Sequence, residues 1–209
     1  MSRRERWNER YAGKELVWSA GPNKLLATEL QSSKPGTALD VACGEGRNAL
    51  WLAEQGWEVT AVDFSEVGID KGRQIARHRG VEIDWRIADL AVDPWPASTY
   101  DLVCVMYLHT DPLERSQWLP RAIEAVAPGG TFFYVGHDPN NIEQGVGGPQ
   151  NRELLPGVAE LTALLEGFDI VRAEIVERQV EADPGHGGGR EGTALDTFVR
   201  AVRQRLSRP

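Results

Sequence analysis

A short segment in the first quarter of the chain constrains its fold most strongly. Residues 38–46 read Ala-Leu-Asp-Val-Ala-Cys-Gly-Glu-Gly, which predicts a buried strand that runs directly into a glycine-rich turn. A helix is expected from Arg47 to Gln55, followed by a second strand at 58–62 that ends on Asp63. This order of strand, glycine turn, helix, strand and acid is typical of a nucleotide-binding βαβ unit. The chain is therefore expected to be an α/β protein.

The glycine pattern by itself fits two kinds of ligand, because residues 44–49 also match the dinucleotide fingerprint. Asp40, just before the turn, favours S-adenosylmethionine (SAM), since a carboxylate suits a cationic ammonium and repels a pyrophosphate. Asp63 can accept hydrogen bonds from both ribose hydroxyls. Asp89 follows the third predicted strand and can accept from an adenine amino group, with Leu90 packed on the ring. Turn-forming aspartates are common at strand ends, but three acids after three successive strands favour a ligand site.

The turn resembles that of the class I SAM-dependent methyltransferases, with Ala42 in place of the family's first glycine. This resemblance is strongest over residues 36–136. The segment Trp7-Asn8-Glu9-Arg10-Tyr11, followed by Val17-Trp18 and Pro22-Asn23, is similar to the small tellurite-resistance and thiol or thiopurine methyltransferase group. The resemblance implies a Rossmann-like, seven-stranded, mostly parallel sheet with helices on both faces and an antiparallel last strand.

SAM is the cofactor that this resemblance implies, held by residues of the turn, the strand ends and the N-terminal segment. These residues are Tyr11, Trp18, Asp40, Ala42, Gly44, Gly46, Asn48, Asp63, Phe64, Asp89, Leu90 and Tyr107. A single domain is expected, with a helical lid at 1–30, a SAM-binding core at 36–136, and substrate-side loops with a terminal strand pair at 137–209. Trp7 and Tyr11 would share one helix face. The lid hypothesis places Tyr11 at the methionine end of SAM, and packing onto the sheet is the alternative.

The rest of the chain is expected to continue as alternating helices and strands. Ser65 is a plausible N-cap and Gly80 a plausible stop for one of the helices. A loop joins the last two strands, which predicts an antiparallel pair. The expected helices are 65–79, 114–127 and 158–165, and the expected strands are 81–87 at a sheet edge, 100–108, 131–136 after a Pro-Gly-Gly break, 169–180 and 194–202.

Two histidines are the candidate catalytic residues. His109 follows the fourth predicted strand and His137 the fifth, and in this fold substrates approach beyond the C-terminal ends of the strands. A general base is needed only when the methyl acceptor is a poorly ionised hydroxyl or amine. The N-terminal resemblance favours a thiol or chalcogen acceptor, with oxygen and nitrogen as open alternatives. A structural role is the alternative for each histidine.

Composition and net charge limit the classes of partner that the protein can bind. The net charge of −8 argues against nucleic-acid binding, and no apolar run is long enough to span a membrane. Two cysteines suit a reducing cytoplasm, and no metal-ligand spacing is present. We therefore expect a cytoplasmic monomer or homodimer that acts on a small molecule without a metal. The alternatives are an NAD-dependent oxidoreductase and a non-catalytic SAM- or nucleotide-binding module.

Overall fold

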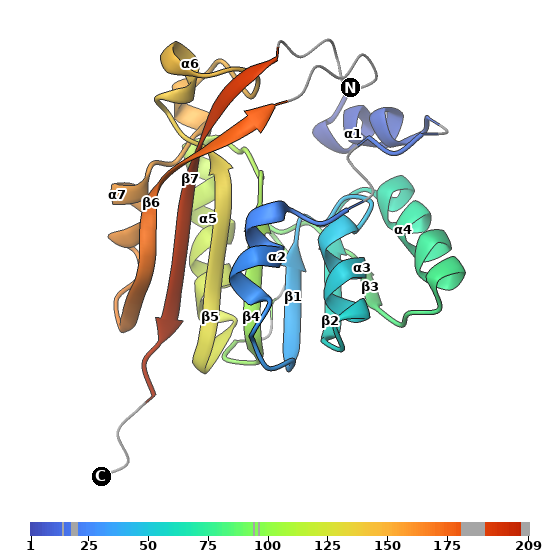
Figure 1. Ribbon diagram of the computed structural model, residues 1–209. Coiled ribbons are helices and arrows are strands. Elements are labelled where there is room, and N and C mark those ends of the chain that lie inside the picture. Colours follow the sequence, from blue (N-terminus) through green and yellow to red (C-terminus); the bar gives the residue numbers. More distant parts are fainter. Residues whose placement is uncertain (14, 18–20, 94, 96, 181–190, 206–209) are drawn as a thin grey trace. The chain divides into compact units, whose positions relative to one another are not determined.

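The computed structural model describes residues 1–13, 15–17, 21–93, 95, 97–180 and 191–205. Its strands form a seven-stranded sheet in the order β3-β2-β1-β4-β5-β7-β6, with helices around it (Figure 1). This confirms the predicted Rossmann-like α/β fold. The chain divides into two compact units, Met1–Pro94 and Trp95–Pro209, which we describe one at a time. The predicted single-domain organisation stays a prediction.

The first unit contains the βαβ arrangement that the sequence predicts. Strand β1 pairs in parallel with β2, and β2 pairs in parallel with β3. Strand β3 is shorter than expected, since it begins at Asp84 rather than at residue 81. The elements are α1 (Arg3–Tyr11), α2 (Lys24–Leu30), β1 (Thr37–Val41), α3 (Arg47–Glu54), β2 (Glu58–Asp63), α4 (Glu66–Arg79) and β3 (Asp84–Ile87).

Helix α4 has the ends predicted for it. The Ser65 hydroxyl accepts a hydrogen bond from the Gly68 amide at 3.1 Å, which caps the first turn. Gly80 follows the last turn with a left-handed backbone, the conformation that commonly ends a helix. Helix α4 contacts β2 and β3. Ser65 and Gly80 therefore fix the two ends of a helix that packs on this part of the sheet.

The second unit carries the remaining strands. Strand β4 pairs in parallel with β5, whereas β7 pairs antiparallel with both β5 and β6. The predicted antiparallel last strand is therefore confirmed. The elements are β4 (Tyr100–Met106), α5 (Pro112–Glu124), β5 (Val126–His137), α6 (Asn141–Gln144), the short 3-10 helix η1 (Arg152–Leu154), α7 (Val158–Thr162), β6 (Phe168–Val180) and β7 (Gly192–Arg203).

Several boundaries in this unit differ from the prediction, and two of them have a clear structural cause. Helix α5 starts at Pro112 rather than at residue 114, because Asp111 caps it by accepting from the Glu114 amide at 2.9 Å. Strand β5 starts at Val126 and runs through the Pro-Gly-Gly segment that was expected to break the chain. The ladder to β4 absorbs this segment as an irregularity, since its register shifts between Tyr100 and Leu102.

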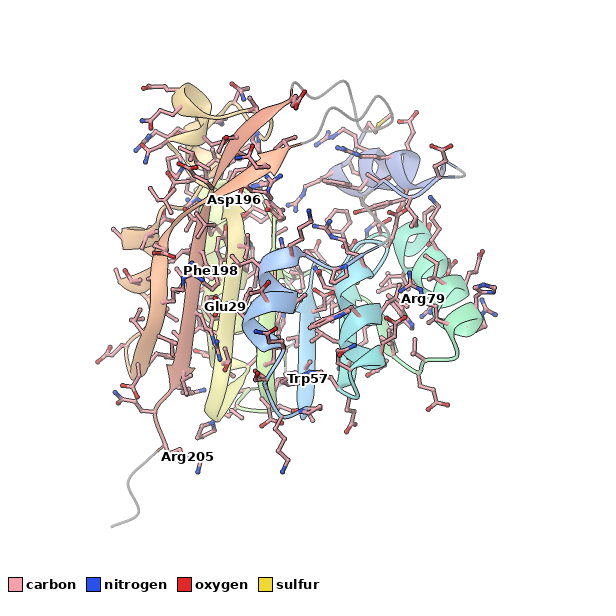
Figure 2. The ribbon with its side chains drawn as sticks, in the orientation of Figure 1. Glu29, Trp57, Arg79, Asp196, Phe198 and Arg205 are labelled. Carbon is pink, nitrogen blue, oxygen red and sulfur yellow. The ribbon has the colours of Figure 1, made fainter. Side chains whose placement is uncertain are left out.

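Large apolar side chains fill the core of the second unit. Phe133 of β5 and Phe198 of β7 are fully buried, with their ring centroids 5.1 Å apart. Figure 2 labels Phe198 and Asp196, which comes two residues earlier in β7. Trp118 of α5 is also fully buried, and its indole donates to the Thr110 hydroxyl at 2.9 Å. This packing supports the strand ends at which the candidate histidines lie.

Candidate functional site

The glycine-rich turn between β1 and α3 has a left-handed backbone at three positions. The φ angles are 56° at Ala42, 57° at Gly44 and 78° at Gly46. Glycine is favoured there because it has no Cβ to clash with the backbone. The Cys43 amide donates to the Val62 carbonyl at 3.0 Å, and the Gly46 amide donates to the Cys43 carbonyl at 2.8 Å. The protein's own contacts therefore fix the shape of this turn.

Asp63, at the end of β2, holds the turn from the neighbouring strand. One carboxylate oxygen accepts from the Gly44 amide at 2.9 Å, and the other accepts from the Ser65 amide at 2.7 Å. Burial raises the pKa of Asp63 above its ordinary value, and the backbone hydrogen bonds oppose that shift. A carboxylate has about four lone-pair sites, so Asp63 retains capacity for further donors such as ribose hydroxyls.

Asp40 and Asn48 each have a structural partner. Asp40 is buried, and one of its carboxylate oxygens accepts from the Ala49 amide at 3.1 Å in the first turn of α3. The Asn48 side-chain oxygen accepts from the Asn23 amide at 2.9 Å, which joins α3 to the start of α2. These contacts account for the burial of both polar side chains. Their roles in cofactor binding stay predictions.

Asp89 forms a turn after β3, as the alternative interpretation of this residue expects. Its carboxylate accepts from the Ala91 amide at 3.0 Å, and its own amide donates to the Asp93 carboxylate at 2.7 Å. Leu90 beside it is buried. The hydrogen bonds of this turn hold the Asp89 carboxylate in a fixed place. Its contact with adenine stays a prediction.

Helix α1 lies against the glycine turn through Tyr11. A Cβ on Gly44 would come within 2.5 Å of the Tyr11 hydroxyl oxygen, and one on Gly68 within 3.2 Å of the Tyr11 ring. The rings of Trp7 and Tyr11 stack at a centroid distance of 5.5 Å, which confirms that they share one helix face. Tyr11 thus lies against the glycine turn, and its predicted contact with the methionine end of SAM stays a prediction. Trp18 lies outside the described residues.

Two further contacts fasten α1 to the start of α4. The Ser65 hydroxyl donates to the Asn8 side-chain oxygen at 2.6 Å. The Arg3 guanidinium lies over the ring of Phe64, 5.1 Å from its centroid. One face of Phe64, a predicted cofactor contact, is therefore in contact with a cation in this structure.

Glu45 is a residue of the glycine turn whose importance the sequence analysis missed. It is buried, and its carboxylate pairs with the ammonium of Lys71 on α4 at 3.0 Å and accepts from the Val17 amide at 2.9 Å. The Lys71 ammonium also donates to the Glu15 carbonyl at 2.9 Å. This ion pair therefore anchors the segment that follows α1. The acid inside the turn was the one signal in the sequence, but nothing in the spacing linked it to Lys71.

Trp85 of β3 explains two glycines without any ligand. A Cβ on Gly46 would come within 2.3 Å of the indole ring, and one on Gly72 of α4 within 2.4 Å of it. The same side chain thus leaves no room for a Cβ at either glycine. Gly46 therefore has a packing function in addition to its predicted place in the cofactor site.

The second unit brings the two candidate catalytic histidines together. His109 Nε2 and His137 Nδ1 are 3.3 Å apart, within hydrogen-bonding distance. Their ring centroids are 5.1 Å apart, and the ring of Tyr107 contacts His137 edge-on at the same centroid distance. The structure therefore places the two candidate residues side by side, and their catalytic role stays a prediction. Because one facing nitrogen must accept the proton that the other donates, the pair is suited to sharing one proton.

A buried carboxylate supports this pair through Tyr107. The Tyr107 hydroxyl donates to Asp196 at 2.6 Å, and Arg178 Nε donates to the same carboxylate at 2.7 Å. The Arg178 guanidinium also lies 5.4 Å from the centroid of the Tyr107 ring. Tyr107 has a left-handed backbone, with φ at 53°. The predicted cofactor contact Tyr107 is therefore held by the end of β6 and by β7, and its role toward SAM stays a prediction.

The environment of the histidines disfavours their protonated forms. Burial, with a further contribution from His137, lowers the pKa of His109 to about 3. Burial also lowers the pKa of His137 below its ordinary value. Burial raises the pKa of Tyr107, whose hydroxyl donates to Asp196. At neutral pH the pair is uncharged, which makes it a weak proton acceptor.

Two kinds of feature are absent from the part of the chain that the structure describes. No helix there has the length and apolar character needed to cross a membrane. Within the same residues, no group of three or more His, Cys, Asp or Glu side chains is arranged to hold a metal ion.

Residues 38–130 match the model of a protein family described as "Methyltransferase domain". The chain is 29% identical over 130 residues to the ubiquinone biosynthesis O-methyltransferase of Coxiella burnetii (strain Dugway 5J108-111), which covers 61% of this chain and 55% of that protein. The chain thus spans about half the length of the curated relatives that it matches first. The matched segment includes the glycine turn, Asp63 and the pair Asp89–Leu90.

Two solved structures share the fold. One is described as "Conversion of a Disulfide Bond into a Thioacetal Group during Echinomycin Biosynthesis", with 21% identity, a TM-score of 0.76, and coverage of 99% of this chain and 93% of that chain. The other is the N-methyltransferase NodS from Bradyrhizobium japonicum WM9 in complex with S-adenosyl-L-homocysteine (SAH), with 17% identity, a TM-score of 0.69, and coverage of 96% and 97%. At these identities the likeness concerns the fold.

Proposed function

We propose that this protein is a SAM-dependent methyltransferase that transfers a methyl group to a small-molecule acceptor. The observation that carries the proposal is the glycine turn tied to Asp63, inside the segment that matches a methyltransferase domain. The names of the matched relative and of NodS support the reaction, and the SAH in NodS supports the cofactor. The net charge of −8 supports a small molecule over a nucleic acid.

The residues of the first unit fit this cofactor. Asp63 retains acceptor capacity for the ribose hydroxyls, and Asp89 with Leu90 would hold the adenine. Asp40 and the turn at Gly44 would hold the methionine part. When bound, SAM supplies an activated methyl group on a positively charged sulfur. The protein's own task is to orient the acceptor and to exclude water.

For the acceptor, we propose a thiol or another chalcogen. A thiolate ionises near neutral pH, so its methylation does not need a strong base. The pKa of His109, lowered to about 3, and the lowered pKa of His137 agree with this, because lowering the pKa of a base makes it a poorer proton acceptor. The resemblance of the N-terminal segment to thiol methyltransferases points the same way. One of the structural neighbours concerns chemistry at sulfur, according to its description.

A hydroxyl acceptor is the second candidate. The matched relative from Coxiella burnetii is named as an O-methyltransferase, and a neutral histidine pair could accept the proton of a hydroxyl. In that case His109 or His137 would act as the general base, and its substitution would cost roughly 10²–10⁴ in rate. For a thiol, the same substitution would change mainly the affinity for the acceptor.

The test is an acceptor screen with purified protein and SAM, in which thiols, phenols, amines and tellurite are compared by detection of the methylated product. We expect methylation of at least one thiol or chalcogen substrate. His109→Ala and His137→Ala should then retain most of the kcat, with His78→Ala as the control for an exposed histidine. Methylation of phenols alone, with a large loss of kcat in either variant, would replace the thiol proposal by the hydroxyl one. No transfer to any acceptor, despite SAM binding, would favour a non-catalytic binding module.

A further inference from the structure

Strand β6 is an edge strand of the sheet, and among the described strands it pairs with β7. Its other backbone edge is not paired with any strand in the described residues. Three apolar side chains are exposed on this strand, with exposed fractions of 45% at Ile170, 55% at Val171 and 44% at Ile175. A long edge strand with exposed apolar residues is a ready template for pairing with another chain.

The sequence of this edge is complementary to itself. Residues 170–176 read Ile-Val-Arg-Ala-Glu-Ile-Val, with two apolar residues and one charge on each side of Ala173. We propose that two copies of this chain associate by antiparallel pairing of their β6 strands, centred on Ala173. Val171 of each copy then lies opposite an isoleucine of the other, and Arg172 lies opposite a glutamate. Apolar pairs and opposite charges that face each other across strands are stabilising.

The charges select one register. Residues that lie opposite each other in a sheet point to the same face, so the allowed centres of a symmetric pair are single residues. A pair centred on Arg172 would place two arginines opposite each other, and one centred on Glu174 would place two glutamates there. Like charges in that position are destabilising. Strand β7 pairs Ile170 with Ala201 and Arg172 with the neighbouring Arg200, so Ile170 does not share a face with Val176, and the complementary stretch is limited to residues 171–175.

Most of residues 170–176 have the regular backbone of a β-strand. The register to β7 shifts between Ile170 and Arg172, which makes Val171 the extra residue of a bulge. From Arg172 to Val180 the ladder continues without interruption. The irregularity therefore lies at one end of the complementary segment, and the residues around Ala173 keep the extended form that a further strand needs.

The charges at the centre are already ordered within one chain. Arg172 Nε donates to Glu174 at 2.6 Å, and the Arg172 guanidinium lies 5.1 Å from the centroid of the Phe198 ring. In the pair of chains, the two arginines and two glutamates would alternate around the two-fold axis. Main-chain hydrogen bonds would provide affinity, and the side chains would provide specificity. An isologous pair of this kind is closed, because each copy uses its β6 edge once.

The test is a charge swap followed by analytical ultracentrifugation over a range of protein concentrations. The wild-type protein should form dimers. Arg172→Glu and Glu174→Arg should each be monomeric, because each places four like charges at the centre. The double variant Arg172→Glu/Glu174→Arg should regain the dimer. An equimolar mixture of the two single variants should form a heterodimer, since every facing pair in it is again of opposite charge.

The mixture separates pairing between chains from the ion pair within one chain, because mixing cannot repair a contact inside either variant. Lys34→Glu, an exposed charge reversal in the first unit, is the control and should remain dimeric. A wild-type monomer at every concentration, or single variants that stay dimeric, would overturn the proposal. So would a mixture that contains only monomers, provided that circular dichroism shows both variants folded. The inference does not rest on the proposed function, and these measurements need no substrate.

Discussion

At the scale of single residues, Ala42 is the position where this chain departs most visibly from the family's glycine pattern. Its φ of 56° places an alanine in a region that costs about 1–2 kcal/mol for a residue with a Cβ. We expect Ala42→Gly to raise the free energy of unfolding by about 1 kcal/mol, because glycine relieves the strain but gains entropy in the unfolded chain. Denaturant unfolding measures this. Ala49→Gly in α3, where the backbone is helical, should have the opposite sign.

The buried histidine pair predicts how stability depends on pH. The pKa of His109 is lowered to about 3 in the folded state, whereas an unfolded histidine titrates near 6.5. Between these values the unfolded chain binds the additional proton, so stability is fully present above pH 6.5 and is lost as the pH falls. We expect the free energy of unfolding to decrease between pH 7 and pH 5 by roughly 1–2 kcal/mol more in the wild-type protein than in His109→Gln.

Chemical denaturation at a series of pH values would measure this difference. His78→Gln, at an exposed position, should keep the wild-type pH dependence. If His109→Gln showed the same slope as the wild type, the pKa of His109 would not be lowered by burial. The same shift means that any rising limb of the rate due to His109 should lie below pH 6 rather than near pH 6–7.

At the scale of elements, the N-terminal segment is held by one partly buried ion pair. Lys71→Met would leave the Glu45 carboxylate buried without its cation, which is costly even though Lys71 itself is partly exposed. We expect faster proteolytic cleavage within residues 1–20 and weaker SAH binding, measured by limited proteolysis and calorimetry. Lys34→Met is the matched control. Unchanged SAH affinity in a protein whose segment is cleaved faster would mean that this segment packs on the turn without acting as a lid.

The sequence predicted elements better than it predicted contacts. The βαβ unit, both ends of α4 and the antiparallel last strand followed from local signals such as caps, glycines and alternation. The prediction that the Pro-Gly-Gly segment breaks the chain before β5 was wrong, because the pairing of this segment depends on β4, a strand that lies far away in the sequence. For the same reason, the Glu45–Lys71 pair could not be predicted, since it joins a turn to a helix 26 residues later. The proximity of His109 and His137 was predictable because it needs only adjacent parallel strands.

At the scale of the whole molecule, ligand binding should appear as a change in thermal stability. A ligand that binds the folded state raises the melting temperature by mass action. We expect SAM and SAH to raise it and NAD to leave it unchanged, because Asp40 disfavours a pyrophosphate. In Asp63→Ala the shift with SAH should shrink, since a charge-assisted hydrogen bond contributes about 1.5–3 kcal/mol. A larger shift with NAD than with SAH would favour the oxidoreductase alternative.

The indole of Trp85 couples the effects of substitutions at positions 46 and 72, which lie far apart in the sequence. Since the same ring lies against Gly46 and Gly72, a side chain at either glycine displaces it, and the second substitution then costs less than the first. During sequence divergence these three positions should change together. A relative with a small residue in place of Trp85 would lose the indole contact at both positions at once. Glycine would then still be favoured at position 46 by its left-handed backbone, and a Cβ at position 72 would still lie 3.0 Å from the Glu45 carbonyl oxygen. Both glycines are therefore explained in part by packing, and their presence alone says nothing about catalysis.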